Sequence, residues 1–130
     1  MMEIALRAAL VAWLAADPTL AERLNAVTEE APSRASLPWL AISASASADW
    51  GCKTHDGREV RIALELHCRG DRPDAAGDLV AAIERRIASL PRAQDGYRVI
   101  TARFLRARAE QRGESRRAFL LEYRFRLLAA

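Results

Sequence analysis

The chain has 130 residues, of which 51% are hydrophobic and 28% are charged, with a formal net charge of +3. This balance excludes a collagen-like, wholly coiled-coil or wholly disordered chain, and no apolar run approaches the roughly 18 residues of a membrane-spanning helix. The length suits one domain spanning 1–130, and the N-terminus shows no clear secretory signal.

Two helices are predicted at the N-terminus. From Met2 to Ala16 the large apolar side chains recur largely at helical spacing, with alanines between them. Asp17 is a good N-cap for a second helix, and Pro18 suits its first position because the missing N–H is not needed there. The apolar stripe of this second helix is formed by Leu20, Leu24 and Val27. The polar segment 28–36 is then a connection.

A strand, a loop and a second strand follow. Pro38–Ser47 opens with an apolar run and continues as alternating serines and alanines, which are weak strand formers. Ala48–Gly57 ends in the turn signal Asp56-Gly57. Arg58–Cys68 alternates strictly, so that one face is apolar and the other face is polar. The polar face consists of Glu59, Arg61, Ala63, Glu65 and His67.

A third helix and two further strands complete the chain. Asp74–Leu90 follows a break at 70–73 and is amphipathic, with Glu84, Arg85 and Arg86 on its outer surface. Tyr97–Ala109 and Arg117–Leu127 are strands joined by the tip Glu110–Ser115. Strict alternation in the first of these strands places Val99, Thr101 and Leu105 on one side and Ile100, Ala102 and Phe104 on the other.

The predicted order is α-α-β-β-α-β-β, an α+β fold in which helices cover one face of a mainly antiparallel, four-stranded sheet. The Asp74–Leu90 helix is about 25 Å long at 1.5 Å per residue and carries the chain back along the sheet. The third strand then runs parallel to the second through a right-handed crossover. The Ala48–Gly57 loop and the Glu110–Ser115 tip should therefore point to opposite ends of the sheet.

The sequence lacks the motifs of phosphate-binding loops, nucleophile elbows and zinc proteases. Cys52, His55, His67 and Cys68 are the one set with metal-ligand character. His67 and Cys68 are neighbours on a strand, so their side chains face opposite sides and cannot both reach one metal ion. We therefore predict a non-enzyme with no catalytic residue, metal, cofactor or disulfide.

Positive charge is concentrated near the C-terminus. Residues 97–130 carry nine arginines and three glutamates, whereas residues 1–96 have a net charge of −3. The arginines of the last two strands are either a phosphate-facing surface or a charged interface in which glutamates pair with them across strands. We favour the charged interface because aromatic stacking platforms are missing from that face, Phe104 excepted. The arginines concerned are Arg103, Arg106, Arg108, Arg124 and Arg126.

Several short segments, in their order and spacing, resemble the tail-terminator (tail-completion) family of long-tailed bacteriophages and gene transfer agents. The likeness spans nearly the whole chain. The segments are the opening helix with Asp17-Pro18-Thr19-Leu20-Ala21, then Leu37-Pro38-Trp39, Asp49-Trp50-Gly51-Cys52-Lys53-Thr54, Gly57-Arg58-Glu59-Val60-Arg61, Asp95-Gly96-Tyr97-Arg98-Val99 and Arg124-Phe125-Arg126.

This resemblance implies a structural protein of a virion or virion-like particle, made in the bacterial cytoplasm. Such proteins form a ring, usually of six subunits, on the last ring of the tail tube. The ring stops tube polymerisation, offers a docking surface to the head-completion proteins and lets DNA pass through its lumen. The implied partners are other copies of the chain, the tube protein, a head-completion or stopper protein and, transiently, DNA, with no membrane.

Two groups of residues are candidates for these contacts. The loop and the tip supply candidate partner contacts at Trp50, Lys53, Thr54, Arg112, Glu114 and Arg116. The polar sheet face supplies a candidate ring interface or lumen face at Arg61, Glu65, Arg106, Arg108, Glu122, Arg124 and Arg126. Trp50 is either tucked under its loop or offered to a partner. An adaptor or stopper elsewhere in the neck and a small basic nucleic-acid-binding protein are the alternative functions.

Overall fold

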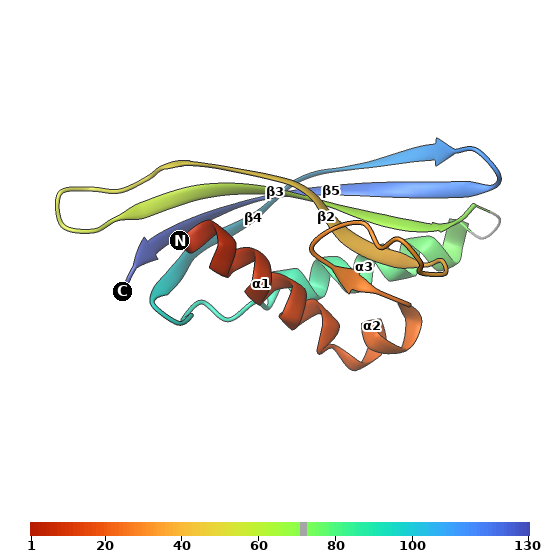
Figure 1. The fold of residues 1–130 in the computed structure, drawn as a ribbon, viewed down its shortest axis with the longest axis horizontal. Coiled ribbons are helices and arrows are strands. Elements are labelled where there is room, and N and C mark those ends of the chain that lie inside the picture. Colours follow the sequence, from red (N-terminus) through yellow and green to blue (C-terminus); the bar gives the residue numbers. More distant parts are fainter. Residues whose placement is uncertain (71–72) are drawn as a thin grey trace.

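The computed structural model describes residues 1–70 and 73–130, which form three helices and five strands (Figure 1). The predicted break at 70–73 includes positions 71–72, which lie outside the described residues. The helices are α1 (Met2–Ala15), α2 (Pro18–Arg23) and α3 (Pro73–Ala88). The strands are β1 (Val27–Thr28), β2 (Trp39–Asp49), β3 (Gly57–Arg69), β4 (Tyr97–Arg112) and β5 (Arg116–Ala129). Within the described residues no helix has the length and apolar character of a membrane span.

The α+β class is confirmed, but the prediction of four strands in the order α-α-β-β-α-β-β was wrong because it omitted β1. Helix α2 ends at Arg23, and Leu24 has an extended backbone, so neither Leu24 nor Val27 belongs to a helical stripe. The side-chain amide of Asn25 donates to two carbonyls of the following connection at 2.9 and 3.0 Å. This anchoring lets β1 pair in parallel with Leu40-Ala41 of β2, which makes the sheet mixed.

The strand order is β1-β2-β3-β5-β4. Strand β5 is antiparallel to both of its neighbours, so β4 runs in the same direction as β3, as predicted. In the register of β3 against β5, Gly57 lies opposite Leu128 and Arg69 lies opposite Arg116. The β2–β3 loop and the β4–β5 tip therefore lie at opposite ends of the sheet, which confirms the prediction (Figure 1).

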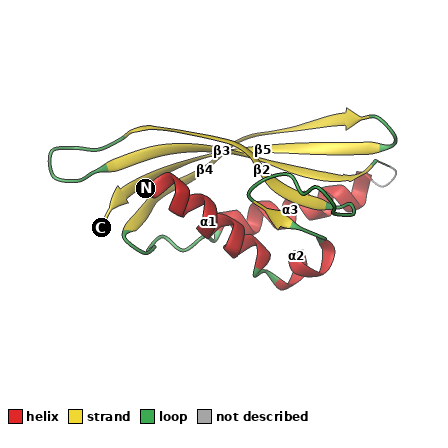
Figure 2. Cartoon of the chain, in the orientation of Figure 1, coloured by secondary structure: helices red, strands yellow, loops and turns green. Residues whose placement is uncertain are grey.

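The helices cover one face of the sheet, here called the inner face, and leave the opposite outer face uncovered (Figure 2). The spacing of Leu6, Leu10 and Leu14 puts one side of α1 on the inner face, and α3 presents Leu79, Ile83 and Ile87 in the same way. Each fully buried side chain of this size contributes about 1.5–3 kcal/mol through removal of apolar surface from water. The strand residues beneath them include Val60, Ile62, Leu64, Leu66, Leu121, Phe125 and Leu127.

The alanine and serine run of β2 has a different use on each face. Ser45 points to the inner face, where its hydroxyl donates to Glu3 at 2.7 Å and accepts from Arg7 at 2.8 Å. Hydrogen bonds from Ser47 and Ser45 lower the pKa of the Glu3 carboxyl. The serines thus hold the two charged residues of α1, while the alanines alternate with them on the outer face.

Two β-bulges in β4 decide which of its side chains share a face. The register of β4 against β5 shifts between Val99 and Thr101 and again between Phe104 and Arg106. Because each bulge inserts one unpaired residue, the alternation of faces reverses at both points. The prediction that Phe104 lies on the arginine face was therefore wrong. Phe104 lies on the inner face against Tyr123, with ring centroids 5.5 Å apart.

Arg86 ties α1 to α3, whereas the sequence placed it on the outer surface of the helix. Its guanidinium carbon lies 3.4 Å from the ring centroid of Trp13, and its Nε donates to the Trp13 carbonyl at 2.7 Å. In return the indole N–H of Trp13 donates to the Arg86 carbonyl at 2.8 Å. This reciprocal pair joins the last turns of the two helices.

Candidate interaction surface on the outer sheet face

The outer face is formed by alternate residues of the strands and carries eight arginines and four glutamates. We call this set the outer charged face: Arg61, Arg103, Arg106, Arg108, Arg112, Arg116, Arg124 and Arg126 with Glu59, Glu65, Glu110 and Glu122. It brings together all seven residues predicted for a charged sheet face. Strict alternation would have put Arg103 opposite Arg106 and Arg108, and the second bulge of β4 is what unites them.

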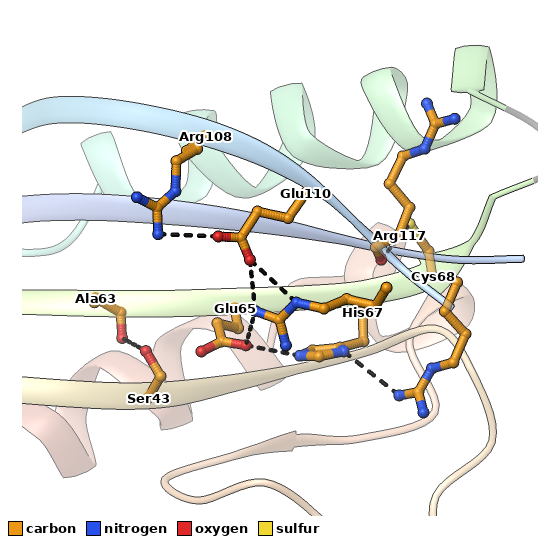
Figure 3. A network of polar contacts seen from close by, with 10 residues as sticks. Ser43, Ala63, Glu65, His67, Cys68, Arg108, Glu110 and Arg117 are labelled. Atoms are coloured by element: carbon orange, nitrogen blue, oxygen red, sulfur yellow. Dashed lines mark hydrogen bonds and ion pairs between the residues drawn. The ribbon is translucent and has the colours of Figure 1, made fainter. Parts of the chain in front are cut away.

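Glutamates neutralise the arginines near the β4–β5 tip (Figure 3). Glu110 lies 3.0 Å from Arg108 and 2.8 Å from Arg112. Arg112 also reaches Glu65 at 3.7 Å, and Glu65 lies 2.8 Å from Nε2 of His67. The hydrogen bond from Arg112 is the main cause that lowers the pKa of the Glu110 carboxyl. This end of the face is therefore a connected network with little unpaired charge.

A stacked pair of rings closes the outer face where β2 meets β3. His67 is only 7% exposed and lies almost parallel to Trp39, with ring centroids 4.1 Å apart. Arg116 approaches the other ring nitrogen of His67, with Nη2 at 3.5 Å from Nδ1. Trp39 is itself only 8% exposed, and the stack with His67 covers it. Trp39 lies directly opposite His67 in the register of β2 and β3. The stack could not be predicted from the sequence, because the sequence does not specify this register.

Three arginines lie side by side near the middle of the outer charged face, and we call them the arginine row. Arg61 of β3 is directly opposite Arg124 of β5, which in turn is directly opposite Arg103 of β4. Arg61 and Arg103 are exposed. Within residues 1–70 and 73–130, no ion pair involves either of these two side chains. Like charges placed directly opposite on neighbouring strands destabilise a sheet.

Two glutamates flank the arginine row. Glu59 lies 3.5 Å from Nε of Arg124 and 3.2 Å from Nε of Arg126. On the other side Glu122 accepts a hydrogen bond from Arg106. This bond is the main cause that lowers the pKa of Glu122 and raises that of Arg106. Glu59 was not among the residues predicted for the charged sheet face, although it shares the alternation of Glu65 on the same strand.

A shallow hollow of about 570 Å³ lies beside the arginine row. Ala44, Ala46 and Ala63 line it with small side chains, and Arg61 with the Arg106–Glu122 pair stands at its edge. The alanines that made β2 a weak strand prediction are what leave this space on the outer face.

The β2–β3 loop holds the predicted contacts Trp50, Lys53 and Thr54. Trp50 is half-buried, and the guanidinium carbon of Arg126 lies 5.5 Å from its ring centroid, so the indole packs against the sheet of its own chain. Lys53 and Thr54 are exposed. Hydrogen bonds involving Thr54 lower the pKa of the exposed Cys52 thiol to about 7. Cys52 and the buried Cys68 are both free thiols.

The β4–β5 tip holds Arg112, Glu114 and Arg116. Glu114 and Ser115 adopt positive φ angles of 58° and 59°, which turn the chain tightly between the strands. Glu114 is exposed, Arg112 is paired with glutamates, and Arg116 is half-buried beside His67. In the described part of the chain, His, Cys, Asp and Glu side chains form no group of three or more able to hold a metal ion.

Comparison with known proteins gives a family and a fold. The family described as "Tail completion protein gp17" has a model that matches residues 8–128, which confirms the resemblance seen in the sequence. A chain of the solved structure "Virion of native gene transfer agent (GTA) particle" shares the fold, with a TM-score of 0.78 and 23% identity over 96% of both chains. No curated protein matches the chain. The chain is a structural component of a virion tail rather than an enzyme, and it belongs to the tail completion protein gp17 family.

Proposed function

We propose that the chain forms a ring that caps the tail tube, ends tube polymerisation and joins the tail to the head-completion proteins, while DNA passes through its lumen. The observation that carries this proposal is the placement of two projecting segments at opposite ends of one sheet. A subunit that ends one assembly and begins the next needs two separate contact sites. The β2–β3 loop and the β4–β5 tip provide them within a single domain.

The edges of the sheet support ring formation. Strand β4 ends the strand order on one side, and β2 is paired with β1 only at Leu40 and Ala41 on the other. Contacts between unlike edges of successive copies are head-to-tail, and they close into a ring when the rotation between copies divides the circle. Six copies are the number that the family resemblance implies.

Each tip makes one of the two axial contacts. Lys53 and Thr54 are available in the loop, with Trp50 behind them, whereas Glu114 leads the opposite tip. One tip contacts the tube protein and the other contacts the head-completion protein. The rest of the outer charged face, apart from Arg112 and Arg116 at the β4–β5 tip, lies between the two axial contacts.

The proposal is tested in particles that lack this gene and are complemented by variants. We expect the deletion to give tails of uneven length without heads, and wild-type protein to restore joined particles by electron microscopy. Arg112→Glu should retain the fold and reduce tail–head joining, because it reverses charge beside the tip. Arg85→Glu, an exposed change on α3, is the matched control and should leave joining unchanged.

Two results would contradict the proposal. Uniform tail lengths in the deletion strain would show that another protein ends the tube. A folded Arg112→Glu variant with normal particle yield would remove this tip from the contact. The proposed ring forms when subunits meet the tube end, so the oligomer is best sought in protein released from tails. Native mass spectrometry of that protein should give a closed oligomer of one size.

A further inference from the structure

We propose that the outer charged face binds the phosphodiester backbone of duplex DNA through Arg61 and Arg103, with Arg124 between them. The inference deepens the proposed function and rests on it for the presence of DNA at this face. The binding itself is a property of the chain and is measurable without tail or head proteins. The contact is electrostatic and independent of base sequence.

The arginine row carries positive charge that an anion from outside the chain could neutralise. Neighbouring strands are about 4.8 Å apart, so the backbones of the three arginines form one row across β3, β5 and β4, with all three side chains on the outer face. The flanking glutamates are engaged, since Glu59 serves Arg124 and Arg126 while Glu122 binds Arg106. An anion seated over the row would remove the repulsion between Arg61, Arg124 and Arg103.

The distribution of charge favours a nucleic acid over a protein surface. Interfaces between proteins are depleted of charged residues at their centre, with charge on the rim. Here the centre is charged, and the face as a whole has eight arginines against four glutamates. Protein–DNA interfaces are strongly positive and wet, and the planar guanidinium fork suits phosphate oxygens. The hollow beside Arg61 leaves room for a sugar–phosphate segment.

The aromatic side chains favour backbone contact over base stacking. Single-strand binders stack bases on exposed rings. On this face Trp39 is buried beneath His67, and Trp50 is covered in part by Arg126. Phe104, the one exposed ring expected on this face, lies on the inner side. The four glutamates also limit affinity, which suits a contact with DNA that must keep moving.

The test is fluorescence anisotropy of the purified chain with a labelled duplex of mixed sequence, at salt concentrations from about 50 to 200 mM. The variant Arg61→Gln/Arg103→Gln removes two unpaired guanidinium groups from the face. Arg34→Gln/Arg85→Gln removes the same charge from exposed positions outside the face. If each lost contact lowers the salt slope by about 0.9, the first variant lowers it by about 1.8. The ratio of the wild-type affinity to the affinity of Arg61→Gln/Arg103→Gln should then fall about 12-fold between the lowest and the highest salt concentration. The corresponding ratio for the control variant should not change in this way.

Three results would overturn the proposal. One is an equal loss of affinity in both double variants, which would reduce the effect to net charge. Another is retention of the duplex by Arg61→Gln/Arg103→Gln with an unchanged salt slope. The third is binding of polyglutamate, but not duplex DNA, in an Arg61- and Arg103-dependent way, which would make the occupant an acidic protein surface. Thermal unfolding of both variants verifies the fold, and particle assembly by microscopy reports separately on the ring.

Discussion

Two glycines show how differently single positions in this chain tolerate an added methyl group. A Cβ at Gly57 would lie 2.6 Å from the Trp50 carbonyl oxygen in the β2–β3 loop and 2.9 Å from the Leu128 side chain of β5. A Cβ at Gly77 of α3 would meet nothing within 4 Å. We expect Gly57→Ala to lower the free energy of unfolding by about 1–3 kcal/mol through overpacking. Gly77→Ala should raise it by about 0.5–1 kcal/mol through helix propensity.

Urea unfolding of the two variants and the wild type measures both effects under one condition. Because the same atoms are added at each position, the opposite signs isolate the local environment from any general effect of alanine. A Gly57→Ala midpoint equal to or above that of the wild type would contradict the close contact at Gly57, and a lowered Gly77→Ala midpoint would contradict the open space at Gly77.

Individual residues also show which parts of the structure could be predicted from the sequence and which could not. The two faces of β3 were predicted correctly because its alternation is uninterrupted from Val60 to Leu66. The faces of β4 were not, because a bulge at Ile100 has no alternation signal of its own and depends on the register with β5. The arginine row likewise follows from pairing: Arg61, Arg124 and Arg103 are far apart in sequence and meet only when β5 lies between β3 and β4.

At the scale of elements, the junction of α1 and α3 depends on one side chain with fixed geometry. Arg86 stacks on Trp13 and donates to its carbonyl, which uses the planar guanidinium in two ways at once. Lysine keeps the charge but lacks that plane. We expect Arg86→Lys to lower the free energy of unfolding by about 1–3 kcal/mol, the sum of a charged hydrogen bond and a partly desolvated cation–π contact.

The neighbouring Arg85 is exposed on the same helix and supplies the matched control. Arg85→Lys should change the free energy of unfolding by no more than about 0.5 kcal/mol, as is usual for surface positions. Equal unfolding midpoints for Arg86→Lys and Arg85→Lys would show that the interhelical contact contributes little.

Elements with long periodic patterns were predicted from the sequence, and the shortest strand was not. Helices α1 and α3 and strands β3 and β5 have long periodic runs, so burial of one face fixes them. Strand β1 has two residues, and its pairing with β2 depends on the anchoring of Asn25 across the connection. A two-residue strand carries no period, so tertiary contact alone creates it.

For the whole molecule, acid should weaken the outer charged face. The pKa values of Glu110 and Glu122 lie below the ordinary 4.5, chiefly because Arg112 and Arg106 donate hydrogen bonds to them. A carboxyl with a lowered folded-state pKa stabilises the fold above its unfolded value, and this contribution is lost as the pH falls through the folded value. Both carboxylates are about one-third exposed, 33% and 34%, so each contribution is small.

We therefore expect the urea midpoint to fall as the pH drops below about 4.5. Glu122→Gln should be less stable than wild type near pH 7, and the difference should vanish in acid, where the wild-type carboxyl is also neutral. A difference that is constant across this range would assign the effect to packing of the side chain instead of its charge.

The opposite placement of the two tips predicts two separable assembly defects. Lys53→Glu changes the β2–β3 loop and Glu114→Lys changes the β4–β5 tip; both residues are exposed, and neither packs in the core. In the proposed ring one tip contacts the tube and the other contacts the head-completion protein, so one variant should give tails of uneven length. The other should give tails of normal length that lack heads. Electron microscopy of complemented deletion particles distinguishes the two, and the double variant should show both defects. If both single variants produced the same defect, the tips would share one partner, and a subunit bridging two assemblies along its sheet would be the wrong description.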